Sequence, residues 1–401
     1  MKGSMEAVKQ EYQSPSTTTP DAVDAGSVFA PAVGKPRRMY YGDAIRIFGT
    51  IAVVIGHVAD LRLFDTHVLD RNWWVCNIWD SLTRWAVPVY IMLSGALLLD
   101  PARLEDPRDF YRKRLTRIGV PLVFWTVFFM WFDVKYTEWR PNWTAAWLNL
   151  ALGKPYVHLH FIFRIAGLYF FTPMLRVWLG HTHRNMQCWT VGMALVLSAG
   201  DSIMNAITHN EPSVFARFVP FVGYYLLGYL LRDATLSPKG VWRAWGGFIV
   251  SYFVLLLGTG LTVHLFHKPG TFLNGPPSLE MLQYDFLSPV RIVMAICAWL
   301  LFVNSFNKPW PKSEAARYRV SGWAGTTLGI YLIHPMFREI LYTRRLWIPG
   351  ATRIHWLSYH FGPERPNIWL GIPLMAIVVY ALSLAVISVV MLIPYVRRIA
   401  G

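Results

Sequence analysis

The sequence predicts an all-α membrane protein, a polytopic bundle of about ten transmembrane helices. Of its 401 residues, 54% are hydrophobic and only 15% are charged, whereas about 25% of the residues in a soluble domain are charged. The apolar residues also fall into repeated uninterrupted runs. Each run is close to the roughly 20 residues that cross a hydrocarbon layer as a helix.

Ten apolar runs follow one another along the chain. They cover residues 43–63, 76–99, 118–134, 157–179, 187–206, 216–231, 244–266, 286–306, 321–342 and 367–394. The run at 118–134 is short, so nine or eleven helices are also compatible with the pattern. Residues 1–38 are rich in Ser, Thr, Pro, Ala and Gly and contain no apolar run suited to a signal peptide, which predicts a disordered cytoplasmic tail. We expect residues 39–401 to form one transmembrane domain.

The positive charge is distributed as in a membrane protein. The net charge is +15, and the basic residues gather in the loops on the side of the tail, above all within 103–117, 232–243 and 308–319. Because cytoplasmic loops carry an excess of Lys and Arg, we expect both termini in the cytoplasm and the chain in the inner (plasma) membrane. The partner that this charge indicates is the lipid bilayer and not a nucleic acid.

The first predicted helix contains three ionisable residues, Asp43, Arg46 and His57. Arg46 and His57 are eleven residues apart, which places them on one helix face about 16 Å from each other, and Asp43 shares that face. A cation near the cytoplasmic end with an imidazole three turns deeper suits a donor with a phosphate-rich head and a long thin arm, such as coenzyme A. The alternative is an interfacial Asp43–Arg46 ion pair beside a hydrogen-bonded core histidine.

A second basic group follows the second predicted helix. Arg114 and Arg117 are neighbours at i and i+3, and paired guanidinium groups suit phosphate oxygens; alternatively, they only set the topology and contact anionic lipids. Arg84 is expected at the outer end of the second span, where Pro88 and Gly95 permit a kink and a close helix approach.

Histidines elsewhere give weaker signals. His334 lies in the ninth span, four residues before Arg338, and either lines the same cavity as His57 or packs in the core. The pairs His158/His160 and His181/His183 have i, i+2 spacing, which points the rings to different helix faces, and no clustered carboxylate or cysteine completes a set of ligands. We therefore expect no metal site.

Taken together, these residues resemble the acyltransferase-3 family of integral-membrane sugar O-acyltransferases. The resemblance runs from about residue 40 to the C-terminus, in family order. It rests on Asp43–Arg46 with His57, Arg84 with Val87-Pro88 and Ser94-Gly95, Arg114 with Arg117, His158-Leu159 followed by Leu168-Tyr169 and Thr172-Pro173, and Tyr331-Leu332 with His334-Pro335. His160 is a departure, because the family commonly has Trp there, which puts the usual choice of acceptor in doubt.

The resemblance implies acetyl-CoA or another acyl-CoA as the donor substrate, with no bound cofactor. It implies an acceptor hydroxyl on a cell-surface polysaccharide or its lipid-linked sugar precursor, polysaccharide-assembly proteins as possible partners, and an essential His57. In the mechanism that we expect, His57 is the general base. Asp60, one turn further, either orients the imidazole in a dyad or is an outer-loop residue that faces water. Asp43, Arg46, Arg84, Arg114, Arg117 and His334 are the expected substrate-binding residues.

Two other functions fit the same sequence. A transporter or flippase of a glycan or lipid-linked intermediate also has buried charges and broken helices, although no inverted repeat is visible. A membrane-bound O-acyltransferase of the unrelated histidine-and-asparagine type would use the late histidine, His334, in place of His57.

Overall fold

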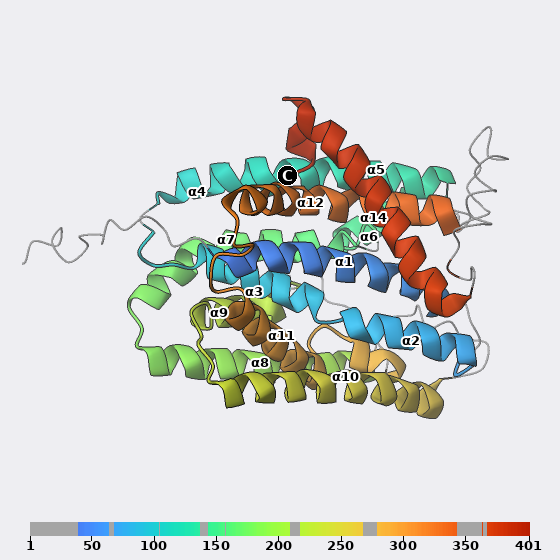
Figure 1. The fold of residues 1–401 in the computed structure, drawn as a ribbon, viewed down its shortest axis with the longest axis horizontal. Helices are drawn as coiled ribbons and strands as arrows, with labels where there is room; N and C mark the ends of the chain where they lie inside the picture. The colour runs from blue at the N-terminus through green and yellow to red at the C-terminus, as the bar shows by residue number, and fades with distance from the viewer. Residues whose placement is uncertain are drawn as a thin grey trace, which may run out of the picture. The chain divides into compact units, whose positions relative to one another are not determined.

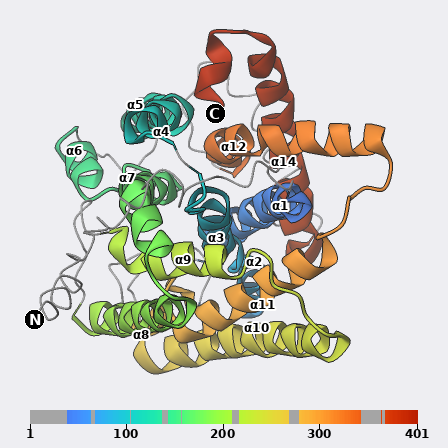
Figure 2. The same ribbon diagram turned by 90° about the vertical axis from the view of Figure 1, so that its left-hand side faces the viewer.

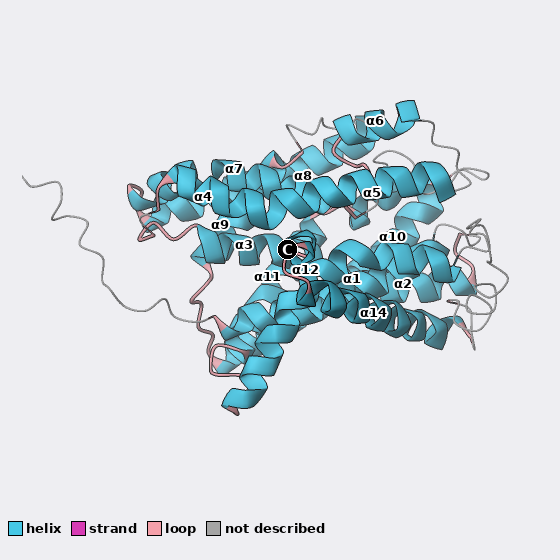
Figure 3. Ribbon diagram, turned by 90° about the horizontal axis from the view of Figure 1, so that it is seen from above, coloured by secondary structure: helices cyan, strands magenta, loops and turns pink. Residues whose placement is uncertain are grey.

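The computed structural model describes residues 39–63, 68–103, 105–136, 143–156, 158–208, 217–267, 279–342, 363 and 367–401. Every regular element within these residues is a helix (Figure 3). The prediction of an all-α membrane protein is therefore confirmed.

The helices follow one another along the chain as labelled in Figure 1. They are α1 (Tyr40–Leu63), α2 (Arg71–Thr83), α3 (Ala86–Leu98), α4 (Pro107–Arg114), the π-helix η1 (Leu115–Gly119), α5 (Val120–Tyr136), α6 (Trp143–Ala151), α7 (His160–Gly180), α8 (Arg184–Thr208), η2 (Val219–Phe221), α9 (Val222–Leu230), α10 (Pro238–Phe266), η3 (Leu279–Tyr284), α11 (Pro289–Ser305), α12 (Glu314–Tyr342), α14 (Ile368–Leu392) and η4 (Val396–Ile399).

Eight helical segments within the described residues are long and apolar enough to cross a membrane. Two further predicted spans are helical but differ from these eight: Val219–Leu230 is short, and α12 is long but less apolar. The predicted run at 118–134 was too short, because the helical segment begins at Pro107 and includes the basic helix α4. About ten spans remains a fair description of the bundle.

The spans alternate in direction, which gives the bundle two ends. At the end of α1 that carries Arg46, the Tyr41 hydroxyl donates to the Arg232 carbonyl (3.0 Å) and Arg176 Nε donates to the Leu98 carbonyl (2.6 Å). At the opposite end of α1, the Tyr342 hydroxyl donates to the Leu61 carbonyl (3.4 Å). We call these the Arg46 end and the Asp60 end. In the view along the helices, α1 lies between α14 and α3 (Figure 2).

Helices α3 and α9 pack closely against each other through two glycines. A Cβ atom added at Gly95 would lie 1.8 Å from the Tyr225 carbonyl oxygen, and one added at Gly228 would lie 1.9 Å from that of Met92. Only glycine fits at such distances, as in other close crossings of membrane helices. The expected close approach at Gly95 is thus present, and it fixes the helix that carries Ser94 and Leu98.

The helices at the edge of the bundle expose large apolar side chains. Trp189 and Val196 of α8 and Trp242 and Leu257 of α10 are among them, with exposed fractions from 59% to 77%. A soluble protein rarely shows a continuous surface of this kind. It is the surface that acyl chains would cover.

Candidate active site

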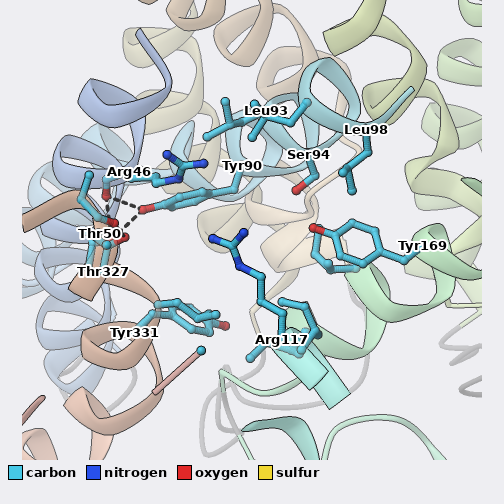
Figure 4. A pocket seen from close by; sticks show the side chains of 18 of the residues that line it. Arg46, Thr50, Tyr90, Leu93, Ser94, Leu98, Arg117, Tyr169, Thr327 and Tyr331 are labelled. Carbon is cyan, nitrogen blue, oxygen red and sulfur yellow. Dashed lines mark hydrogen bonds between the residues drawn. The ribbon is translucent and has the colours of Figure 1, made fainter. Parts of the chain in front are cut away.

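Four arginines converge on a cavity of about 490 Å³ at the Arg46 end. Arg46, Arg114 and Arg117, which the sequence indicated, are joined there by Arg103. We call this the arginine cavity. Its other lining residues include Thr50, Tyr90, Ser94, Phe161, Tyr169 and Tyr331. Figure 4 shows the side chains of Arg46 and Arg117 reaching into it from different walls.

Arg46 is held by its own helix. Its Nη1 lies 3.0 Å from Asp43 Oδ1, an i, i+3 ion pair in which the Arg46 side chain keeps a 30% exposed fraction. The Arg46 carbonyl accepts hydrogen bonds from the Tyr90 hydroxyl (2.6 Å) and the Thr50 hydroxyl (2.7 Å). Asp43 therefore lies where it was expected to orient Arg46, and α1 is tied to α3 beside the cavity.

The arginine pair of the second basic group lies at a change of helix type. Arg114 ends α4, and Arg117 lies within the π-helix η1, whose turn is wider than that of an α-helix. π-Helical turns are frequent at functional sites. The simple i, i+3 geometry inferred from the sequence does not hold here, but both side chains still line the arginine cavity.

An ionic cluster anchors α4. Glu105 accepts a hydrogen bond from Lys113 Nζ (2.7 Å), and its other oxygen lies 3.6 Å from Arg176 Nη1. Arg114 and Arg176 both lie against the Phe110 ring, at 5.2 and 4.9 Å from its centroid. The hydrogen bond from Lys113 holds the pKa of Glu105 below its usual value. This cluster fixes where Arg114 enters the cavity.

His57 and His334 are hydrogen-bonded to each other. His57 Nδ1 lies 3.0 Å from His334 Nε2, although 277 residues separate them. His334 Nδ1 lies 2.8 Å from the Tyr331 carbonyl, which can only accept. His334 therefore carries its proton on Nδ1, its Nε2 accepts, and His57 must donate from Nδ1. The remaining nitrogen of neutral His57, Nε2, then carries a lone pair to which no described residue donates a hydrogen bond.

A third imidazole completes this group. His158 is fully buried, its Nε2 lies 3.1 Å from the Leu332 carbonyl, and its ring lies 5.7 Å from that of His334. Its Nδ1 has no hydrogen-bond partner among the described residues. The sequence indicated His158 as half of a metal-like pair and as part of the His158-Leu159 motif, but not as a neighbour of His334. The structure separates the pair, because His160 packs against Phe286 at 5.5 Å.

Asp60 does not orient His57. Its Oδ1 accepts a hydrogen bond from Arg84 Nη2 (2.8 Å), while the orienting contact of His57 comes from His334. The expected Asp60–His57 dyad is thus replaced by a histidine pair. The cause is the packing of the α2–α3 turn against α1, which brings a guanidinium group to Asp60.

Arg84 lies deeper than predicted. It occupies the turn between α2 and α3, in the middle of the Arg71–Leu98 span, and not at the outer end. It also binds the buried Asp80 and lies 4.1 Å from the centroid of the Tyr284 ring. Sequence reasoning missed Asp80, although its i, i+4 spacing to Arg84 is a usable signal.

A wall of aromatic side chains bounds the arginine cavity on the side of the histidines. The ring of Phe161 lies 6.1 Å from Tyr90 and 5.6 Å from Tyr331. Tyr331 lines the cavity with its side chain and fixes His334 with its carbonyl. His57 itself does not line the cavity, so the expected open path from the guanidinium groups to the imidazole ends at this wall.

Comparison with known protein families identifies the class. A family profile described as an acyltransferase domain matches residues 39–392. The chain belongs to the acyltransferase-3 family. No curated protein and no solved structure matches it. The resemblance inferred from the motifs is therefore confirmed, and this acyltransferase-3 protein is a multi-pass membrane acyltransferase.

Proposed function

We propose that this acyltransferase-3 protein transfers an acetyl group from acetyl-CoA to a hydroxyl of a cell-surface polysaccharide or of its lipid-linked precursor, with His57 as the general base. The observation that carries the proposal is the protonation pattern of the histidine pair. It leaves His57 Nε2 as a lone-pair acceptor within a membrane acyltransferase.

His57 alone can both accept the proton of the hydroxyl and return it to the leaving thiolate. Its Nε2 takes the proton of the sugar hydroxyl as the oxygen attacks the thioester carbonyl, and the new ester bond forms as the carbon–sulfur bond breaks. The departing thiolate then takes the proton from the imidazolium. Throughout, His57 Nδ1–H keeps donating to His334, so the positive charge on His57 strengthens that hydrogen bond.

The arginine cavity supplies the donor site. Four guanidinium groups in one cavity match the phosphates of coenzyme A, because guanidinium–phosphate hydrogen bonds are charge-assisted. To reach His57, the acyl arm has to pass the wall formed by Phe161 and Tyr331, so the proposal requires these side chains to move when the donor binds. In this arrangement the Arg46 end lies on the cytoplasmic side of the inner membrane, where acetyl-CoA is made. The acceptor and any polysaccharide-assembly partner approach from the Asp60 end.

The alternative base, His334, is less suited. It is fully buried, and both of its ring nitrogens are engaged, one by His57 and the other by the Tyr331 carbonyl. A base needs a free lone pair directed at the substrate, which only His57 offers in this pair. Membership in an acyltransferase family likewise favours this chemistry over transport.

The test is thiol release from acetyl-CoA by the purified full-length protein in the presence of a polysaccharide acceptor. We expect His57→Ala to lose about 100- to 10,000-fold in kcat. Arg114→Ala should chiefly raise the KM for acetyl-CoA. His183→Ala, at an exposed loop histidine, is the control. Wild-type turnover by folded His57→Ala protein would refute the assignment of the base.

A further inference from the structure

Arg164 is a buried cation without an ion-pair partner among the described residues. It lies in α7, four residues from the start of the helix, and only 8% of its surface is exposed. Within the same residues its Nε and Nη1 also have no hydrogen-bond partner. Its guanidinium group instead lies 4.6 Å from the ring centroids of both Phe221 and Phe286.

One further arginine and one carboxylate lie close to Arg164. Arg291 lies 4.1 Å from the same Phe286 ring, and its guanidinium group donates to the Arg84 and Tyr284 carbonyls at 2.7 and 2.6 Å. The carboxylate is that of Asp285, whose Oδ1 accepts hydrogen bonds from the Ser202 hydroxyl and the Leu287 N–H. Within the described residues Asp285 forms no hydrogen bond or ion pair with Arg164, so the guanidinium group of Arg164 has no direct anionic partner there.

An unpaired guanidinium at this depth has an energetic cost. Burying a charge without a partner costs several kcal/mol, and contacts with aromatic rings return only about 0.5–2 kcal/mol. Ionisable residues within membrane spans usually mark substrate sites for this reason. By contrast, the guanidinium of Arg84 in the same half of the bundle is neutralised by Asp60 and Asp80.

We propose that Arg164, between Phe221 and Phe286, binds an anionic oxygen group of the acceptor, so that the acceptor is an acidic carbohydrate. This inference rests on the proposed function. The location suits an acceptor site: Arg164 is three residues from Phe161 of the aromatic wall, and His160, one turn nearer the Asp60 end, packs on the same Phe286 ring. The two rings hold the guanidinium group in place, and Arg164 supplies the charge that binds the anionic group.

The test compares two oligosaccharides of equal length on the purified full-length protein, an oligogalacturonate and a neutral malto-oligosaccharide. We expect the wild type to bind the acidic one more tightly. Arg164→Met should weaken that binding about 10- to 150-fold, the loss of affinity that corresponds to one charge-assisted hydrogen bond. Arg243→Met, at an exposed arginine in the first turns of α10, is the control for the loss of one positive charge and should bind as the wild type does.

Three results would overturn the inference. One is equal wild-type affinity for the two saccharides, which needs no variant and holds even if Arg164→Met fails to fold. Another is unchanged oligogalacturonate binding by folded Arg164→Met. The third is tight binding of a short-chain polyprenyl phosphate with none of oligogalacturonate, which would assign the site to a lipid phosphate. Binding of coenzyme A is measured in parallel. If the wild type does not bind coenzyme A, the proposed function is refuted. If Arg164→Met still binds coenzyme A, the substitution has changed only the acceptor site.

Discussion

The hydrogen bond between His57 and His334 gives the sharpest test of how the base is prepared. Replacing His334 with Leu keeps an apolar side chain in the bundle but removes the acceptor 3.0 Å from His57 Nδ1. When His57 becomes protonated, that hydrogen bond is charge-assisted and worth about 1.5–3 kcal/mol. At about 1.4 kcal/mol per factor of ten, its loss lowers kcat about 10- to 150-fold. The KM for acetyl-CoA should stay unchanged, because the arginine cavity is not altered.

His334→Gln separates the hydrogen bond from packing. Its amide oxygen can occupy the place of Nε2 and accept from His57, so we expect it to recover most of the kcat that His334→Leu loses. The assay is thiol release from acetyl-CoA with acceptor present, on protein whose unfolding midpoint matches that of the wild type. The reasoning fails if His334→Leu keeps wild-type kcat, or if Gln and Leu are equally poor.

Other expectations follow from the same contacts. Arg117→Ala should weaken coenzyme A binding in a titration with little change in kcat, and an unchanged affinity would remove Arg117 from the donor site. Gly228→Ala should destabilise the protein by about 1–3 kcal/mol through overpacking, whereas Gly246→Ala, with open space around it, should not lower the unfolding midpoint. Glu105→Gln should be less stable than the wild type near neutral pH. Because the folded pKa of Glu105 is lowered, its contribution is complete above the unfolded value of about 4.3 and is lost as the pH falls through the folded value. The two melting curves should therefore converge in acid, and a constant difference would contradict this role for the carboxylate.

Sequence reasoning succeeded where one helix determines the geometry. Asp43, Arg46 and His57 share a face of α1 because a regular helix repeats every 3.6 residues, and the structure keeps the Asp43–Arg46 ion pair. The apolar runs likewise located the spans, since the length needed to cross a bilayer is fixed by the bilayer. These features depend on local periodicity and composition only.

The contacts between helices could not be predicted in this way. The partner of His57 is 277 residues away, and the partner of Asp60 became Arg84 because α2 and α3 pack against α1. Periodicity gives the face on which a residue lies but not the helix that it meets. The π-helix at Leu115–Gly119 likewise cannot be predicted from the sequence, because no residue pattern distinguishes it from the α-helix on either side.

The buried arginines differ in their hydrogen-bond and ion-pair partners, and in the proposed function that difference distinguishes the substrate-binding arginines from the structural ones. Arg84 is neutralised by two carboxylates, and Arg291 donates to backbone carbonyls, so both are satisfied within the protein. Within the described part of the chain, Arg114 and Arg164 each keep a buried Nε without a partner, Arg114 at the arginine cavity and Arg164 between Phe221 and Phe286. A guanidinium group that the fold leaves unsatisfied is stabilised when an anion arrives. In the proposed function, the donor and the acceptor are each held by charge at a distance from the reacting atoms, so that binding energy from remote groups positions the thioester and the hydroxyl at His57.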